Sequence, residues 1–304
     1  MSGVKISISV TNQTWPEGPT GLRDNLIKVA EAADLAGLDT LWVPDHLLQA
    51  DPTVSADATD MLEAYTTLGF LAARTERVRL GAMVTAVTFR PPALLIKAVT
   101  SLDVLTGGRA WLGIGAGYHG EEADRMGLPL GPVAERFERL EETLELAQRM
   151  WRGDQRPFEG KHYRLSAPTG LPLPLSGHPP ILIGGDGEKK TLRLVAKYAD
   201  ACNLFDIPDG GATVRRKLAV LARHCADLGR PYQEITKTLA MRLGPTETSE
   251  EFVRRVRDQA KLGIDHVGLV MSQAWTPETI KVLAAAVPEL AEVEPNREPP
   301  ESAV

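Results

Sequence analysis

The stretch from residue 79 to residue 119 constrains the fold of this chain most. It holds two short apolar runs, at residues 80–84 and 110–114, in which polar and apolar residues do not alternate. Such runs are typical of strands buried on both faces, as in parallel sheets covered by helices. Between them, Pro91-Pro92 opens a helical pattern over residues 93–106 that Gly107-Gly108 ends. The stretch therefore predicts a strand, a helix and a second parallel strand.

The rest of the chain repeats this alternation. Further strands are predicted at residues 5–10, 40–44, 181–184, 201–205, 235–243 and 266–271. Further helices are predicted at residues 21–37, 61–75, 132–151, 189–199, 213–228, 248–262 and 277–287, with a capping box at 248–251. Eight strand–helix pairs predict an α/β protein with a (β/α)8 TIM barrel, and a doubly wound open sheet is the alternative.

One segment interrupts the alternation. Residues 152–179 contain a hairpin pattern at 158–165 and a proline-rich run, and they are too few to bury a core of their own. We therefore expect an insertion between strands four and five of a single domain over residues 1–287. Residues 288–304 are rich in proline and glutamate and are expected to form a flexible tail.

Composition narrows the class of protein. The formal net charge of −6 argues against a broad nucleic-acid-binding surface, and no apolar run approaches the roughly 18 residues of a membrane span. The first ten residues read as a strand and lack the form of a signal peptide. Cys202 and Cys225 fall in a predicted strand and a predicted helix, which favours reduced core thiols in a cytoplasmic protein over a disulfide.

The first candidate for chemistry is the pair Asp45-His46. It directly follows the strand that Pro44 ends, and a barrel carries its active site at the carboxyl ends of its strands. A histidine there can give or take a proton near neutral pH. The adjacent carboxylate could orient the imidazole or bind a cofactor. The alternative is a pair that only caps the following loop.

Two glycine-rich turns are candidate ligand-binding loops. Gly113, Gly115 and Gly117 do not form a dinucleotide fingerprint, because the third glycine of that motif would fall at Tyr118. Their amides are nevertheless open to a phosphate or a flavin-like ring. The second turn, residues 184–187, precedes a predicted helix that starts directly at Glu188, an arrangement suited to an anion. A plain tight turn is the alternative.

Other candidates are weaker. The third strand ends at Met83, Val84 and Thr85, where a strained backbone would suggest a ligand clamp and an ordinary strand end is the alternative. Trp15 could line the cleft or simply pack. The remaining five histidines have no metal-ligand spacing and are expected at the surface or in the core: His119, His162, His178, His224 and His266. The sequence also shows no serine-nucleophile elbow, and no metal site is expected.

With these motifs in place, the chain resembles the bacterial luciferase-like superfamily. It looks most like the branch that uses the deazaflavin coenzyme F420 in place of flavin mononucleotide (FMN). The resemblance extends over most of residues 4–287, and the segments that carry it are residues 42–46, 84–91, 102–109, 112–117, 184–185, 189–192 and 199–203.

The resemblance implies a site. The cofactor ring would lie at the strand ends against a bulge that often holds a non-prolyl cis peptide, here at Met83–Val84. Asp45 would bind the ring, and His46 would stand beside a small-molecule substrate as proton donor or acceptor. The phosphate tail would reach the amides of two turns: Gly115, Ala116, Gly117 and Tyr118, and Gly184, Gly185 and Asp186. Members of the family commonly form homodimers through barrel helices.

One departure from the family's residue pattern bears on the identity of the substrate. Glucose-6-phosphate dehydrogenases of this branch carry a glutamate where this chain has Ala116, and a tryptophan shortly after the Asp-His pair that residues 46–50 lack. Glu121 and Glu122 are near but out of register. We therefore expect an oxidoreductase that transfers hydride between reduced F420 and another small organic molecule. The alternatives are a monooxygenase that uses reduced FMN and a barrel that binds cofactor without turnover.

Overall fold

The computed structural model describes residues 3–300 and forms a closed parallel barrel. The strands are β1 (Lys5–Ser9), β2 (Thr40–Val43), β3 (Arg79–Ala82), β4 (Thr85–Ala86), β5 (Leu112–Gly115), β8 (Ile181–Gly184), β9 (Ala201–Phe205), β10 (Thr236–Arg242) and β11 (His266–Val270). They lie in the order β3-β2-β1-β11-β10-β9-β8-β5-β4. A bridge from Leu80 to Ala110 closes the ring. Because β3 and β4 are two pieces of one barrel strand, the described part contains the eight predicted strands, and the barrel is confirmed.

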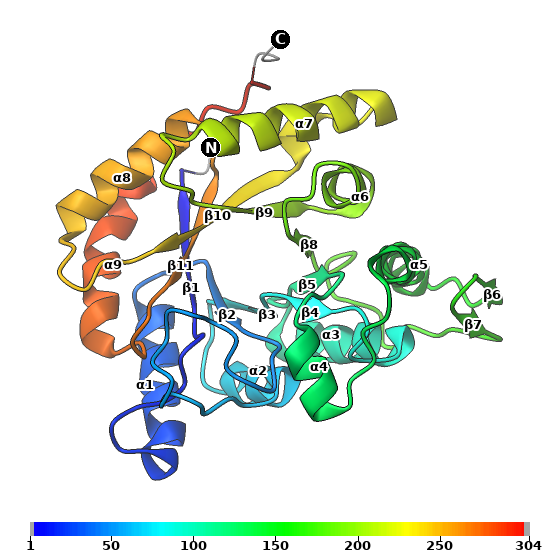
Figure 1. The fold of residues 1–304 in the computed structure, drawn as a ribbon, viewed down its shortest axis with the longest axis horizontal. Helices are drawn as coiled ribbons and strands as arrows, with labels where there is room; N and C mark the ends of the chain where they lie inside the picture. The colour runs from blue at the N-terminus through cyan, green and yellow to red at the C-terminus, as the bar shows by residue number, and fades with distance from the viewer. Residues whose placement is uncertain (1–2, 301–304) are drawn as a thin grey trace.

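The helices surround this sheet (Figure 1). They are α1 (Pro19–Leu35), α2 (Ala64–Ala72), α3 (Pro92–Thr106), α4 (Gly120–Met126), α5 (Val133–Trp151), α6 (Thr191–Tyr198), α7 (Ala212–Leu228), α8 (Ser249–Lys261) and α9 (Pro277–Leu290), with a short 3-10 turn, η1 (Tyr232–Glu234). Local signals set their ends as expected. Gly107 ends α3 in a left-handed conformation (φ 72°), and Thr248 and Glu251 form the predicted capping box of α8.

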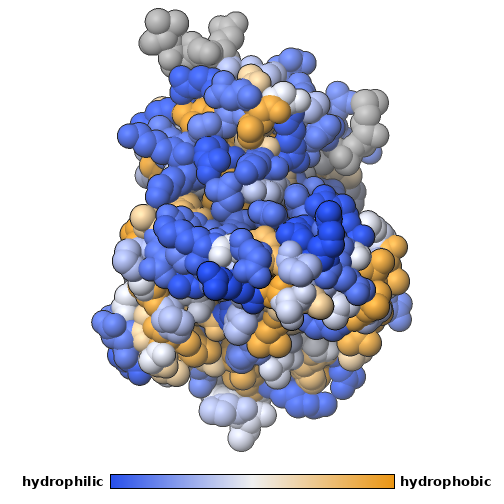
Figure 2. Space-filling model, turned by 90° about the vertical axis from the view of Figure 1, so that its right-hand side faces the viewer, coloured by the Kyte–Doolittle hydropathy of each residue, from blue (hydrophilic) through white to orange (hydrophobic). Residues whose placement is uncertain are grey.

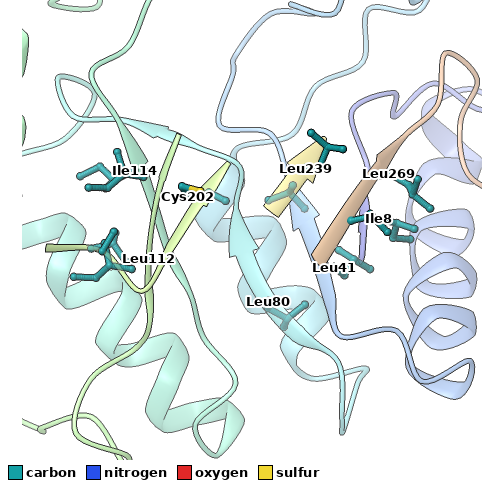
Figure 3. Close-up of a cluster of buried hydrophobic side chains, with 14 of the residues drawn as sticks. Ile8, Leu41, Leu80, Leu112, Ile114, Cys202, Leu239 and Leu269 are labelled. Carbon is teal, nitrogen blue, oxygen red and sulfur yellow. The ribbon is translucent and has the colours of Figure 1, made fainter. Parts of the chain in front are cut away.

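Two apolar layers hold the barrel together. The outer layer lies between the strands and the helices, and Figure 3 shows part of it: Ile8, Leu41, Leu80, Leu112, Ile114, Cys202, Leu239 and Leu269, all buried. Full burial of each such aliphatic side chain stabilises the fold by about 1.5–3 kcal/mol. The inner layer fills the barrel with Trp42, Trp111, Leu182 and Ala201, and the two indole rings lie 5.5 Å apart.

The insertion is a hairpin on the outside of the barrel. Strands β6 (Phe158–Glu159) and β7 (Arg164–Leu165) pair antiparallel, as the sequence predicts, and project beyond α5 in Figure 1. The carboxylate of Glu142 on α5 accepts the amide N–H groups of residues 161–163. On this side of the molecule, hydrophilic side chains cover most of the surface, and hydrophobic ones lie in smaller groups between them (Figure 2).

Several predicted details are wrong. Helix α4 was not expected, and α6 begins at Thr191, two residues later than predicted, after a turn at residues 188–190. Before this turn, Lys217 donates to the carbonyl of Asp186 at 2.9 Å. Helix α9 continues past residue 287, through Pro288, to Leu290. For Trp15 the prediction left two possibilities open, and packing is the correct one: the ring is buried, and its Nε1 donates to the carbonyl of Trp275 at 2.9 Å.

The expectation of reduced core thiols is confirmed, because Cys202 and Cys225 are buried free cysteines. Within residues 3–300, no group of His, Cys, Asp or Glu side chains could hold a metal ion. None of the described helices has the length and hydropathy to cross a bilayer.

Candidate active site

A cavity of about 980 Å³ opens at the carboxyl ends of the barrel strands. Its wall contains eleven of the twelve predicted site residues: Asp45, His46, Met83, Val84, Gly115, Ala116, Gly117, Tyr118, Gly184, Gly185 and Asp186. Thr85 does not line the cavity. It is fully buried behind the wall, where its hydroxyl lies 2.9 Å from the Tyr65 hydroxyl.

The end of the third strand forms one wall. The Met83–Val84 peptide is cis, as the resemblance implies. The Val84 side chain packs closely against the two neighbouring strand ends. A Cβ atom added to Gly184 would lie 2.6 Å from Cγ2 of Val84, and a Cβ atom added to Gly115 would lie 3.1 Å from the same Cγ2. Glycine at positions 115 and 184 therefore leaves room for Val84 between the ends of β5 and β8.

Asp45 belongs to a buried charge cluster. Both of its carboxylate oxygens accept from Arg90, at 2.6 and 3.0 Å, and Arg90 also pairs with Glu63. Burial alone would lower the pKa of Arg90, but its hydrogen bonds to Asp45 and Glu63 carry it above the ordinary value. Burial and the Asp45 charge raise the pKa of Tyr65, so this phenol stays protonated. Asp45 is thus held by Arg90 and does not orient its neighbour His46.

His46 is held instead by Glu122, which the sequence did not identify. The side chain of Glu122 is fully buried, and its Oε2 accepts from Nδ1 of His46 at 2.7 Å. Its Oε1 accepts the amides of Leu47 (2.5 Å) and Leu48 (3.0 Å). Because the carboxylate accepts a hydrogen bond from the Nδ1–H group, Nε2 is the ring nitrogen that is free to exchange a proton. It lies 3.5 Å from the Tyr118 hydroxyl at the cavity wall.

Helix α4 places Glu122. His119 caps it through Nδ1, which accepts the Glu122 amide at 3.0 Å, and Gly127 ends it in a left-handed conformation (φ 65°). The His119 ring lies 5.8 Å from that of His46, so this histidine is part of the cavity wall and not a remote one. The signal in the sequence was two glutamates in a first turn, Glu121 and Glu122, with Gly127 five residues after the second.

The outer cavity is apolar, and its charges are paired. Arg242 binds Asp51 at 2.9 Å, and Arg255 binds Glu247 at 2.8 Å. Apolar side chains fill the wall between them: Phe89, Leu130, Val133, Phe137, Phe205 and Ile207. Burial raises the pKa of Asp206, which faces Arg255 across 3.8 Å.

The wall also fits a flat ligand with polar edges. Gly117 and Gly185 turn the chain with φ of 79° and 93°, at the ends of β5 and β8. Asn203 lines the cavity from β9 and is 5% exposed, yet its Oδ1 has no hydrogen-bond partner. A buried unpaired acceptor is costly, so a donor on a ligand would be favourable here.

Comparison with known proteins agrees with this architecture. Residues 4–298 match the family model described as luciferase-like monooxygenase. The chain belongs to this family. An F420-dependent glucose-6-phosphate dehydrogenase from Kineococcus radiotolerans is 31% identical over 245 residues, which span 79% of this chain and 69% of that protein. For one from Nakamurella multipartita, the identity is 34% over 184 residues, but the match spans 60% of this chain and only 51% of the relative.

Solved structures in the luciferase-like fold superpose over nearly the whole chain. An F420-dependent secondary alcohol dehydrogenase in complex with an F420-acetone adduct matches with a TM-score of 0.78 and 16% identity, over 95% of this chain and 99% of that one. A monooxygenase from Streptomyces bottropensis matches with a TM-score of 0.77 and 18% identity, over 94% and 100%. At these identities the two likenesses establish the barrel fold alone.

Proposed function

We propose that this luciferase-like protein is an F420-dependent oxidoreductase that transfers hydride between the reduced deazaflavin and a small organic substrate. The observation that carries the proposal is the position of His46, which could serve as a proton-transfer group. His46, fixed by Glu122, lines the same cavity as the kinked strand end and both glycine turns. Relatives named for F420 dependence at 31% and 34% identity favour this cofactor.

The cavity residues divide into two roles. Met83 and Val84 would support the ring, Asp45 would bind its edge, and the turns at 115–118 and 184–186 would take the phosphate tail. The bound coenzyme would supply the hydride. His46 would hold a proton on Nε2 and deliver it to the substrate atom that becomes negative as hydride arrives at its neighbour, or remove it in the reverse direction.

Glu122 would make this proton transfer possible. Its carboxylate accepts the Nδ1–H in both charge states of the imidazole, so the ring keeps one orientation while Nε2 gains and loses its proton. The amides of Leu47 and Leu48 fix the carboxylate in turn. The apolar outer wall would keep water away from the reacting atoms.

The charge pattern argues for an uncharged substrate. In the described part of the wall, Arg242 and Arg255 are already bound to carboxylates, and Asp45 and Glu122 are bound as well. A second phosphate group would therefore find no free cation beside His46. Like Ala116, this argues against glucose 6-phosphate as the substrate, and a neutral, largely apolar alcohol, carbonyl or imine fits better.

Two measurements test the proposal. Fluorescence titration of the purified protein with F420 and with FMN should show tighter binding of F420. With a substrate found by screening, His46→Ala should keep the affinity for F420 and lose about a hundredfold to ten-thousandfold in kcat. A His46→Ala variant that turns over at the parental rate would exclude the proton-transfer role.

The second candidate is a monooxygenase that uses reduced FMN and oxygen. The family description and the likeness to the Streptomyces bottropensis monooxygenase favour keeping it as the alternative. Preferential binding of FMN in the titration, with oxygen consumed during turnover, would select it. Homodimer formation stays a prediction that light scattering on the purified protein would check.

A further inference from the structure

The hydroxyl group of Tyr118 is a second polar group beside His46. Both residues line the cavity, and Oη of Tyr118 lies 3.5 Å from Nε2 of His46. At that distance the two atoms form at most a weak hydrogen bond with each other, because a good bond between oxygen and nitrogen is about 2.7–3.2 Å long. Neither group is satisfied by the other, so both are available to a third partner in the cavity.

The surrounding residues hold the Tyr118 side chain in this place. Its ring meets the rings of His46 and His119 edge-on, and the centroids lie 5.7 Å apart in both pairs. The backbone before it turns at Gly117 (φ 79°), whose carbonyl accepts from the buried side chain of Arg136. Tyr118 is nevertheless 69% exposed, so a ligand that enters the cavity can reach its hydroxyl group.

Both groups are donors when the imidazole is protonated. Nδ1 of His46 donates to Glu122, so the second N–H group of the imidazolium is at Nε2. Loss of hydration around the hydroxyl, together with the charges of Glu122 and Asp51, raises the pKa of Tyr118 above its ordinary value. The phenol therefore keeps its proton near neutral pH and can donate a hydrogen bond.

We propose that the Tyr118 hydroxyl and Nε2 of His46 together bind one oxygen atom of the substrate, which makes Tyr118 a catalytic residue and a ketone or aldehyde the compound that is reduced. The inference rests on the proposed hydride-transfer function and narrows its substrate class. An acceptor can lie about 2.8 Å from each of two donors that are 3.5 Å apart. A carbonyl oxygen has two lone pairs and can accept from both donors, whereas an imine nitrogen has only one lone pair.

The two residues would have different roles in the step. When the carbonyl carbon receives hydride, the π electrons of the C=O bond move to the oxygen. An O–H bond forms there, the Nε2–H bond of His46 breaks, and the products are an alcohol and a neutral imidazole. Tyr118 would keep its proton and stabilise the negative charge that develops on the oxygen, as a donor of an oxyanion hole does. Oxidation of an alcohol would follow the same steps in reverse.

Tyr118→Phe tests the proposal, because it removes the hydroxyl and keeps the ring and the backbone amide. With reduced F420, the kcat/KM for cyclohexanone should fall about a hundredfold, the effect expected for one donor to a developing oxyanion. The kcat/KM for the imine 2-methyl-1-pyrroline should change by less than about threefold, and the affinity for F420 should be unchanged.

Tyr198→Phe is the matched control. Its hydroxyl also lies 3.5 Å from its partner, Glu141, but Tyr198 lies outside the cavity wall. This variant should leave both values of kcat/KM and the affinity for F420 unchanged.

A binding measurement needs no turnover. Cyclohexanecarboxamide is neutral, and its carbonyl serves as an unreactive analogue of a ketone. It is titrated by calorimetry into the protein alone and into the protein with oxidised F420, and its carbonyl stretch is recorded by isotope-edited infrared difference spectroscopy. Tyr118→Phe should bind the amide about threefold to tenfold more weakly, the effect of losing one neutral hydrogen bond. The carbonyl band should lie at a higher frequency in the variant than in the parent, because each hydrogen bond weakens the C=O bond.

A role of Tyr118 in loop packing alone would leave the carbonyl band at the same frequency in parent and variant, and that result would refute the contact. Equal losses of kcat/KM for the ketone and the imine would refute it too, as would failure of the parent to bind the amide. If the parent binds neither F420 nor FMN, the proposed function fails. The infrared comparison on the protein alone then still decides whether Tyr118 donates to a carbonyl oxygen.

Discussion

Glu122→Gln is the most informative single change, because it replaces one atom in the contact that holds His46. In the parent, Oε2 accepts from Nδ1 of His46 at 2.7 Å, and Oε1 accepts two backbone amides. A glutamine side chain can accept either from Nδ1 of His46 or from the two backbone amides, but not from both. If its oxygen accepts from the amides of Leu47 and Leu48, its NH₂ group faces Nδ1 and disfavours a proton on that nitrogen. If the side chain flips, its NH₂ group faces the two amide N–H groups, and no acceptor remains for them.

Both consequences have an expected size. Loss of a charge-assisted hydrogen bond at a fully buried carboxylate should lower the free energy of unfolding by about 1–3 kcal/mol. That corresponds to a fall in Tm of roughly 2–4 °C per kcal/mol. In turnover, an imidazole held in the wrong tautomer cannot pass its proton through Nε2, so kcat should fall about a hundredfold to a thousandfold.

The assay follows F420 absorbance for turnover, F420 fluorescence for binding, and thermal melts for stability. Glu121→Gln is the matched control, because the neighbouring glutamate is exposed and paired only with Arg125 at 3.3 Å. We expect Glu122→Gln to lower kcat with little change in the affinity for F420, and Glu121→Gln to change neither. Parental kcat in Glu122→Gln, or an equal loss in Glu121→Gln, would refute the reasoning.

Three further predictions follow from packing, charge and the cavity wall. In urea unfolding, Gly113→Ala should lower the free energy of unfolding by about 3 kcal/mol or more, because the new Cβ would lie 1.9 Å from the carbonyl oxygen of Ala82. The control is Gly69→Ala in α2, where the added Cβ would meet no atom within 4 Å. It should leave the free energy of unfolding unchanged or raise it by up to about 1 kcal/mol. Burial lowers the pKa of His266 to about 4, so its neutral form is favoured in the fold and stability is lost as the pH falls from above the unfolded value of 6.5. Between about pH 7 and pH 4.5 the parent should lose about 2 kcal/mol that His266→Gln does not lose, and equal losses in urea unfolding would contradict this. For homologous neutral substrates, kcat/KM should rise about fourfold per added methylene in the apolar outer cavity, while glucose 6-phosphate should give no turnover; a preference for the phosphorylated sugar would refute the charge argument.

The sequence predicted the barrel because every element carries its own signal. Apolar runs without alternation marked the strands, and glycine after Thr106 or the capping box at Thr248 marked helix ends. These signals are local and need no knowledge of distant contacts. The cis peptide at Met83–Val84 was different, since no pattern in the residues implies it and only the family resemblance placed it.

The residues that the sequence missed depend on distant contacts. Helix α4 has seven residues, too few for a helical period to stand out, so Glu122 could not be connected with His46 across 76 positions. Arg136 on α5 is buried and donates to the carbonyl of Gly117, a contact that no spacing within the helix predicts. Both positions become visible only when the barrel brings the loops after different strands together.

Asp45 and His46 are adjacent in sequence, but their side chains bind different partners. The carboxylate of Asp45 is bound to Arg90, in a cluster that reaches Glu63. The imidazole of His46 is bound to Glu122 on α4. Both residues line the cavity, but different partners fix their side chains. Because Glu122 on α4 supplies the carboxylate that binds His46, the proton-transfer role proposed for His46 does not require a glutamate at position 116. Ala116 therefore does not argue against that proposed role, while it still argues against glucose 6-phosphate as the substrate.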